Sequence, residues 1–315
     1  MKPWRVLVCG SNYGQIYFEA LKRNRTAYQP VGLLARGSAR SVALAQAEGA
    51  PLYRSVGELP GGIDLACVAL GMQAAGVVLE LIRRGIPMLC EHPQKPDFLA
   101  RALKMAAGRV PFHLNAHFGW LAAPRTFISE TRRLMTSELP LSLHVQATDR
   151  SLYGLLDIAG LALAGLRPGR FRAIAPSVLR GRMNGAVAAF EIQGSSGRRS
   201  LPDGSPGYLF DQRIAIGFPS GVLTMLSVAG PVVWNQNLGR INALDRPLWN
   251  LHSPAEECTG RRFQEMRIQA NLAALEALAR HVATATPPPE QNPSHILAVS
   301  RLWQRLATLA PPVTS

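Results

Sequence analysis

The sequence has few cysteines and no long apolar run, and each shortage excludes a class of protein. Its 315 residues include 4 cysteines, with no C-x-x-C pair and no metal-ligand spacing. Cys9, Cys67 and Cys90 lie in apolar runs, which favours free buried thiols in a reducing cytoplasm over a disulfide-stabilised secreted fold. The longest apolar candidate, residues 155–166, is interrupted by Asp157 and is shorter than the ~20 residues of a membrane span.

The N-terminal segment also lacks the features of a signal peptide, which needs a longer apolar stretch and a small-residue cleavage site. We therefore expect a cytoplasmic protein without a membrane anchor. A hydrophobic fraction of 47% with 17% charged residues excludes wholesale disorder, collagen and coiled coil.

Acidic residues are scarce relative to basic ones. The counts of 34 Lys+Arg and 20 Asp+Glu leave a formal net charge of +14, supplied almost entirely by arginine. This excess favours an acidic partner, which would be a phosphorylated cofactor, an acidic protein or nucleic acid, although arginine richness also reflects genome composition. No nucleic-acid recognition motif accompanies the charge, so we do not expect nucleic-acid binding.

The first third of the chain alternates apolar strand-like runs with helical patterns. The runs are 5–9, 30–35, 63–70, 87–90 and 112–115. Such alternation predicts βαβ units and a doubly wound parallel sheet. After about residue 120, turn residues separate runs typical of a mostly antiparallel sheet, and these runs are 171–178, 186–193, 208–218, 222–229 and 232–241. We therefore predict an α/β chain with a Rossmann domain over 1–118 and an α+β domain over 119–315, with an open antiparallel sheet, whose C-terminal helices could pack back on the first domain.

The connection after the first strand lacks two of the three glycines of a dinucleotide-binding turn. Aligned on Gly14, the usual G-x-G-x-x-G becomes Cys9-x-Ser11-x-x-Gly14. Small residues here allow the backbone to approach a pyrophosphate at a helix N-terminus. An ordinary strand-to-helix turn is the alternative, but the position in the first βα unit favours a cofactor. The predicted cofactor contacts in this turn are Gly10, Ser11, Asn12, Tyr13 and Gly14.

A carboxylate is absent at the end of the second strand, where an NAD site usually holds the ribose 2′-hydroxyl. Arg36, Ser38 and Arg40 stand there instead. A guanidinium can pair with a 2′-phosphate in bidentate fashion, so we predict NADPH rather than NADH. A solvated basic loop is the alternative. The predicted cofactor contacts further along the chain are Leu70, Glu91 and His92.

The fourth strand ends in the turn Glu91-His92-Pro93. Carboxyl ends of strands in an open α/β sheet face the ligand crevice, which directs His92 toward nicotinamide and substrate. An imidazole has an ordinary pKa of ~6.5, so it can donate a proton near neutrality. A hydrogen-bonded turn residue is the alternative. The scattered histidines show no H-x-x-x-H spacing or carboxylate pairing, and we expect no metal site; they are His144, His252, His281 and His295.

These features resemble the glucose–fructose oxidoreductase/inositol dehydrogenase (Gfo/Idh/MocA) superfamily, in which Glu-Lys-Pro stands at this turn. The replacement of that lysine by His92 resembles a narrower family, the thiazolinyl imide reductases of pyochelin- and yersiniabactin-type siderophore biosynthesis. The segments that carry the resemblance are 8–14, 91–93, 113–118, 151–160 and 165–168.

The resemblance implies NADPH-dependent reduction of a thiazoline C=N bond, on an intermediate tethered to an acidic carrier-protein domain of a nonribosomal peptide synthetase. It also implies, by analogy, a homodimer. The arginine pairs 132–133, 198–199 and 261–262 are candidates for steering the carrier. The implied catalytic residues are His92, His117 and Asp157, and the implied substrate contacts are Asn115, Phe118 and Tyr153.

Two positions depart from the relatives. Leu161 stands four residues after Asp157, where the sugar and polyol dehydrogenases carry a histidine, which argues against polyol oxidation. Phe118 stands where the narrower family would have a tyrosine as a possible acid, which leaves His92 and His117 as candidate proton donors. Two other hypotheses stay open: an oxidoreductase of the same superfamily acting on a small sugar-like or keto substrate, and a non-catalytic NADP-binding regulator.

Overall fold

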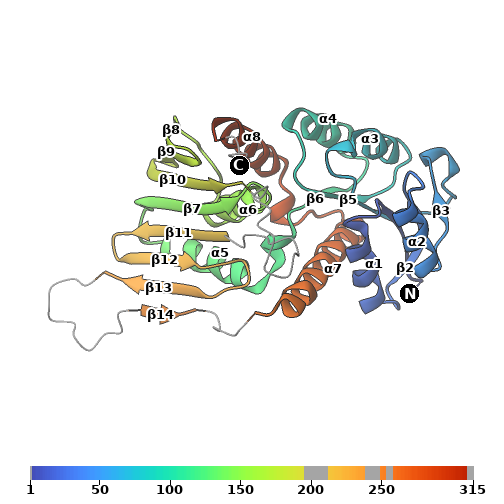
Figure 1. Cartoon of the computed structure of the whole chain (residues 1–315), viewed down its shortest axis with the longest axis horizontal. Coiled ribbons are helices and arrows are strands. Elements are labelled where there is room, and N and C mark those ends of the chain that lie inside the picture. Colours follow the sequence, from blue (N-terminus) through green and yellow to red (C-terminus); the bar gives the residue numbers. More distant parts are fainter. Residues whose placement is uncertain (1, 195–211, 238–248, 253–257, 311–315) are drawn as a thin grey trace. The chain divides into compact units, whose positions relative to one another are not determined.

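The computed structural model describes residues 2–194, 212–237, 249–252 and 258–310 (Figure 1). The chain forms two compact units, Met1–Trp120 with Gly260–Leu297, and Leu121–Thr259 with Ala298–Ser315. The sequence placed the boundary at residue 118 and allowed the C-terminal helices to pack back on the first domain, and in the structure the segment 260–297 belongs to the first unit. The physical reason is helix α7 (Gly260–Thr284), because its apolar side chains Ile268, Leu272 and Leu275 join the core that contains Val6 and Tyr17.

The first unit contains a six-stranded parallel sheet in the order β3-β2-β1-β4-β5-β6. This is the strand order of a doubly wound dinucleotide-binding fold, so the predicted Rossmann architecture is confirmed. The near-continuous burial of the central strands is typical of parallel strands covered on both faces. The strands are β1 (Trp4–Cys9), β2 (Tyr28–Leu34), β3 (Leu52–Tyr53), β4 (Leu65–Val68), β5 (Met88–Glu91) and β6 (Phe112–Asn115).

Helices cover this sheet, and α1 packs beside α7 while α3 packs beside α4 (Figure 1). Local signals fix several of their ends. The Ser38 hydroxyl accepts a hydrogen bond from the Ser41 amide and caps α2, and Pro96 begins α4 at a position where no amide donor is lost. The helices are α1 (Gly14–Arg23), α2 (Ala39–Ala47), α3 (Ala75–Arg83) and α4 (Pro96–Ala106), with short 3₁₀ turns η1 (Val56–Glu58), η2 (Gly71–Gln73), η3 (His117–Trp120) and η4 (Pro289–Gln291).

The second unit is built on an eight-stranded sheet in the order β14-β13-β12-β11-β7-β10-β9-β8. Among its described strands every neighbouring pair is antiparallel except β7 with β10, which confirms the predicted mostly antiparallel sheet. The strands are β7 (Ser142–Thr148), β8 (Arg172–Ala175), β9 (Val178–Met183), β10 (Ala186–Gln193), β11 (Gln212–Phe218), β12 (Gly221–Met225), β13 (Val232–Gln236) and β14 (Trp249–Leu251).

Helices α5 (Ala122–Leu134) and α6 (Leu152–Ala162) pack on each other and contact strands of this sheet, and α8 (Pro293–Leu309) follows later in the chain. The run predicted over 171–178 contains β8 and only the first residue of β9, because Ser177 turns the chain with a φ of 64°; β9 itself was not predicted. The predicted runs 208–218 and 232–241 correspond to β11 and β13, and their remaining residues, 208–211 and 238–241, lie outside the described residues.

The predicted buried thiols are confirmed. Cys9, Cys67 and Cys90 are free and buried, and burial raises the pKa of each thiol, so all three stay protonated. Within the described residues, none of the helices combines the length and the apolar character that crossing a bilayer requires.

Candidate active site

The turn after β1 has the geometry of a cofactor cradle. Gly10 has a φ of +98°, and a Cβ there would lie 2.4 Å from the carbonyl oxygen of Ala69, so only glycine fits. Leu70 packs against the same point, because its Cδ2 would lie 3.3 Å from that Cβ. Gly14 begins α1 and is buried against Val8. The turn therefore leads the bare backbone to a helix N-terminus, where free amides can receive a phosphate.

The second βα turn gathers three guanidinium groups, one of which the sequence analysis missed. Arg36 and Arg40 are exposed, which suits a phosphate contact and a solvated basic loop equally. Gly37, with a φ of +82°, lies between them, and the Arg54 side chain packs on it, with Nε 3.1 Å from the position of a Gly37 Cβ. Arg54 directly follows β3, and β3 pairs with β2, so Arg54 lies beside the turn that follows β2. Ser38 caps α2, which is a structural role. Its contact with the cofactor stays a prediction.

Glu91, at the end of β5, is buried in a hydrogen-bonded network. The Tyr17 hydroxyl donates to Oε1 of Glu91, and the Asn115 amide donates to the same oxygen at 2.7 Å. Burial raises the pKa of Glu91 to about 8, although the two donors and the charge of Arg267 act in the opposite direction. Glu91 is therefore predominantly neutral at pH 7.

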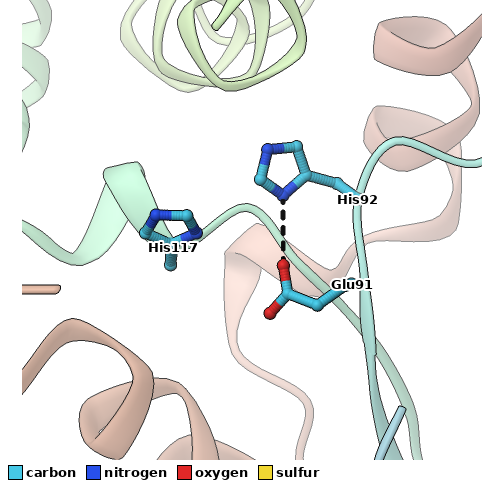
Figure 2. Close-up of side chains that lie close together, drawn as sticks. All are labelled: Glu91, His92 and His117. Carbon is cyan, nitrogen blue, oxygen red and sulfur yellow. Dashed lines mark ion pairs between the residues drawn. The ribbon is translucent and has the colours of Figure 1, made fainter. Parts of the chain in front are cut away.

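His92 follows Glu91 and is held by the neighbouring strand. Its Nδ1 lies 2.6 Å from the backbone carbonyl oxygen of Asn115, and 3.7 Å from Oε2 of Glu91 (Figure 2). A carbonyl oxygen can only accept a hydrogen bond, so Nδ1 carries a proton. The second nitrogen, Nε2, then holds the only lone pair of the neutral ring, and it becomes a donor when the ring gains a second proton.

His117, in η3, is a buried neutral imidazole. The Tyr13 hydroxyl lies 3.1 Å from Nδ1 and 3.3 Å from Nε2, and burial raises the pKa of Tyr13, which keeps this hydroxyl a donor. Burial, followed by His92 and Arg267, holds the pKa of His117 well below its usual value. Figure 2 shows it beside His92, with ring centroids 5.7 Å apart. A ring held neutral in this way is a poor proton donor, so His117 is the weaker of the two candidates.

Helix α7 supplies two residues of the site that sequence reasoning missed. Asn271 is fully buried, accepts a hydrogen bond from Asn115 at 2.7 Å and donates to the Tyr13 hydroxyl at 3.2 Å. Arg267, one turn earlier, lies over the Tyr13 ring at 5.3 Å. Asn271 stands among the apolar residues of this helix. A polar side chain on a buried helix face needs buried hydrogen-bond partners, and this could have marked Asn271 as part of a polar network.

The remaining predicted residues fall into two groups. In the first unit, Phe118 packs edge-on against His117 at 4.6 Å, whereas the Asn115 side chain is fully buried in the network, which favours positioning over substrate contact. In the second unit, Tyr153, Asp157 and Leu161 follow one another at four-residue steps along α6, and Tyr153 packs against Trp303. The predicted roles of Asp157 and Tyr153 stay predictions.

Of the predicted arginine pairs, 132–133 has ordinary local partners. Arg132 donates to the carbonyl of Leu161, Arg133 pairs with Glu130, and the pair 261–262 lies exposed at the start of α7. The pair 198–199 lies outside the described residues.

Glu91, His92 and His117 also offer three metal-ligand atoms, all within 4.8 Å of one another. The hydrogen bonds of these three side chains favour a role other than metal binding. Nδ1 of His92 carries a proton toward Asn115, Glu91 is neutral and receives the Tyr17 hydroxyl, and His117 receives that of Tyr13. A metal ligand must offer a free lone pair or a carboxylate. We therefore assign the cluster to proton handling, and the absence of a metal stays a prediction.

The buried groups of this unit predict a stability maximum near pH 6.5. His113 in β6 lies 2.9 Å from His281, and burial lowers the pKa of His113 to about 3. Between pH 6.5 and 4.5, His113 and His117 are protonated in the unfolded chain and neutral in the folded chain. Over the same range Glu91 is protonated in the folded chain and ionised in the unfolded chain. The unfolded chain therefore binds more protons than the folded chain in this range, so the free energy of unfolding falls as the pH falls.

Above pH 6.5 the neutral Glu91 dominates this balance. The folded state keeps a proton up to about pH 8 that the unfolded state releases near 4.5, so stability falls as the pH rises through this window. Urea unfolding at pH 5, 6.5 and 8 measures both slopes. In Glu91→Gln the alkaline slope should vanish while the acid slope steepens; an unchanged alkaline slope would contradict the buried neutral carboxyl.

The comparisons with known proteins agree with the fold. Residues 4–109 match the GFO_IDH_MocA family, described as an oxidoreductase family with an NAD-binding Rossmann fold. No curated protein sequence matches the chain. Among solved structures, it is similar to the UDP-N-acetylglucosamine 3-dehydrogenase GnnA from Acidithiobacillus ferrooxidans at 15% identity and a TM-score of 0.71, with 98% of each chain covered.

Two further solved structures show the same architecture. One is GenD2 from gentamicin A biosynthesis in complex with NAD, at 13% identity and a TM-score of 0.72, covering 98% of this chain and 95% of that one. The other is levoglucosan dehydrogenase in complex with NADH and levoglucosan, at 11% identity and a TM-score of 0.73, covering 98% and 97%. At these identities the likeness shows the fold alone.

Proposed function

We propose that this chain, whose residues 4–109 belong to the Gfo/Idh/MocA oxidoreductase family with its NAD-binding Rossmann fold, is an NADPH-dependent reductase of a C=N bond. The observation that carries the proposal is the hydrogen bond from Nδ1 of His92 to the Asn115 carbonyl. It leaves Nε2 as the one atom of the ring that can gain or lose a proton at the carboxyl end of β5, where ligands bind in open α/β sheets.

The residues present fit a phosphorylated dinucleotide. The turn from Gly10 to Gly14 would receive the pyrophosphate, and Leu70 would border it. Arg36, with Arg54 packed on the adjoining Gly37, would hold a 2′-phosphate. When bound, the nicotinamide supplies a hydride, and this reactivity belongs to the cofactor.

The protein must supply the accompanying proton. As hydride reaches the imine carbon, the electron pair of the C=N bond moves to nitrogen, which takes the proton from Nε2 of the His92 imidazolium. The ring is left neutral, and its Nδ1 proton stays on the Asn115 carbonyl, so the ring is not reoriented by the transfer. Glu91 and His117 enclose the ring as neutral groups, which limits competing charges beside the transferred proton.

A thiazoline is the substrate class that fits this donor best. Imidazolium is a suitable acid for an imine nitrogen, and it replaces the lysine found at this turn in the sugar enzymes. Leu161 lies one turn after Asp157 on α6, so the histidine expected for polyol oxidation is missing there. We further propose a carrier-bound intermediate of a siderophore-producing nonribosomal peptide synthetase, a homodimeric enzyme, and a cytoplasmic location.

The second candidate is oxidation or reduction of a sugar-like substrate. The names of similar structures favour it, since one acts on UDP-N-acetylglucosamine and another is bound to levoglucosan. Neutral His92 could accept a hydroxyl proton at Nε2 in that reaction. The two candidates differ in substrate and share the cofactor and the titrating atom.

Initial rates of NADPH oxidation with a synthetic thiazoline thioester test the proposal directly. The control reactions supply NADP⁺ or NAD⁺ with UDP-N-acetylglucosamine or levoglucosan. Turnover of the thiazoline with no turnover of the sugars supports imine reduction. Turnover of the sugars alone would replace the proposal with the second candidate, and binding of NADPH without turnover of any of these would favour a regulator.

The coenzyme preference depends on Arg36 in this account. Arg36→Ala should raise the KM for NADPH roughly 10–100-fold while changing the KM for NADH less than about threefold, because only NADPH carries the 2′-phosphate that the guanidinium pairs with. Steady-state kinetics with both coenzymes measure this. Arg109→Ala, at another exposed arginine of the same unit, is the control. An unchanged NADPH:NADH ratio in Arg36→Ala would contradict the assignment.

A further inference from the structure

A cavity of about 820 Å³ in the second unit is lined by an unusual concentration of arginine. It lies at the edge formed by β8 and β9, which Figure 1 labels beside β10. The chemistry-bearing residues of its lining, which we call the arginine pocket, are Arg170, Arg172, Arg180 and Arg182, together with the apolar Phe171 and Val187.

The strand register explains why these side chains gather. Arg172 on β8 is directly opposite Arg180 on β9, and Arg182 is opposite Val187 on β10. Side chains two residues apart on a strand share a face, so Arg180 and Arg182 project on the same side of the sheet. All the residues of β8 are exposed, and the pocket therefore opens to solvent along this edge.

The arrangement is electrostatically costly for the isolated chain. Like charges directly opposite on antiparallel strands destabilise a sheet. Among the described residues no carboxylate forms an ion pair with these four arginines, and Arg182 donates only to the carbonyl of Gly185. The nearest acid in the register, Glu191, is opposite Val178, and its oxygens accept from Gln146 and Gln193. An anion in the pocket would remove this cost.

Apolar side chains beside the arginines favour a protein as the source of that anion. Ile174 on β8 is 53% exposed and Val187 on β10 is 39% exposed. A fifth guanidinium, Arg305, lies over the Phe171 ring at 5.7 Å. Arginine combined with exposed apolar groups is typical of a protein interface, whereas a second copy of this surface would bring like charges together.

We propose that the arginine pocket docks the acidic carrier-protein domain, with guanidiniums receiving its carboxylates and the phosphate that joins the pantetheine arm. This docking role rests on the proposed function, because that function supplies the carrier. Arg is suited to it, since its planar group binds carboxylate and phosphate through paired hydrogen bonds. The contact is electrostatic, so its strength should fall as salt rises.

Binding is tested with the whole protein and a phosphopantetheinylated peptidyl carrier domain of net negative charge. Calorimetry should show that R180Q/R182Q raises the Kd at least about tenfold and flattens its salt dependence, whereas the control Arg301→Gln, an exposed arginine of the same unit, changes it less than about twofold. Removing the pantetheine arm from the carrier should weaken binding to wild type more than to R180Q/R182Q. Equal binding by wild type and R180Q/R182Q would overturn the proposal, as would no binding to wild type.

Kinetics separate this proposal from the function on which it rests. With a thiazoline thioester of N-acetylcysteamine, which has neither phosphate nor carrier, R180Q/R182Q should keep the wild-type rate. With the carrier-bound thioester, kcat/KM should fall about tenfold or more. If carrier binding depends on the arginine pocket but neither substrate is turned over, the proposed function is contradicted and the docking site is supported. Equal losses with both substrates would show that the pocket does not act through the carrier.

Discussion

His92→Ala should lower kcat for NADPH oxidation with a thiazoline by ~10²–10⁴-fold, the range that one positioned proton donor contributes. The loss should fall on the chemical step, because His92 is bonded through Nδ1 to a backbone carbonyl and has only Nε2 to offer. NADPH binding, measured by fluorescence quenching, should change less than about fivefold, which a general disruption of the site would not allow.

The pH profile distinguishes donation from mere positioning. In wild type, kcat should fall as the pH rises and the imidazolium loses its second proton, and His92→Ala should lose that descending limb. His117→Gln is the informative companion, because His117 is already neutral and should contribute far less to this limb. A descending limb that persists in His92→Ala and disappears in His117→Gln would reverse the assignment of the donor.

Gly10→Ala should lower the free energy of unfolding by roughly 2–4 kcal/mol and weaken NADPH binding at least about tenfold. The added methyl would meet the Ala69 carbonyl oxygen at 2.4 Å, and the residue would keep a left-handed φ of +98°. The turn must move to remove this clash. Because the same turn forms the predicted phosphate cradle, its movement should also weaken NADPH binding. Urea unfolding and NADPH titration measure the two effects.

Gly76→Ala is the matched control for that substitution. Gly76 lies within α3, its φ is ordinary and an added Cβ meets nothing within 4 Å. Alanine there should stabilise the protein by about 0.5–1 kcal/mol through helix propensity and leave NADPH binding unchanged. If Gly10→Ala had the stability of the wild type, the turn could accept a side chain at position 10. That result would contradict the claim that only glycine fits in the phosphate cradle.

The sequence predicted what local periodicity and termini encode. Buried apolar runs correspond to β1, β4 and β5, whereas Ser38, predicted as a cofactor contact, caps α2 through its hydroxyl. The turn at Ser177 was not predicted, since a left-handed residue other than glycine leaves little trace in composition.

Long-range placement was beyond sequence reasoning. The pattern of α7 predicts an apolar face but not which sheet covers it, so the sequence allowed the C-terminal helices to pack back on the first domain without fixing that 260–297 lies in the first unit. For the same reason Asn271 was missed, although it bonds to Asn115 across 156 residues of sequence. Glu91 was singled out from its strand end and Asn115 from the family resemblance, and the β5–β6 register pairs them directly.

The position of the coenzyme relative to His92 tests the central claim most directly. A crystal structure of the protein with NADP⁺ should place Nε2 of His92 within about 6 Å of nicotinamide C4, because hydride donor, imine and proton donor must meet at contact distances. The 2′-phosphate should lie against Arg36. A nicotinamide ring more than about 10 Å from the imidazole would contradict the account, because no single imine could then receive both hydride and proton.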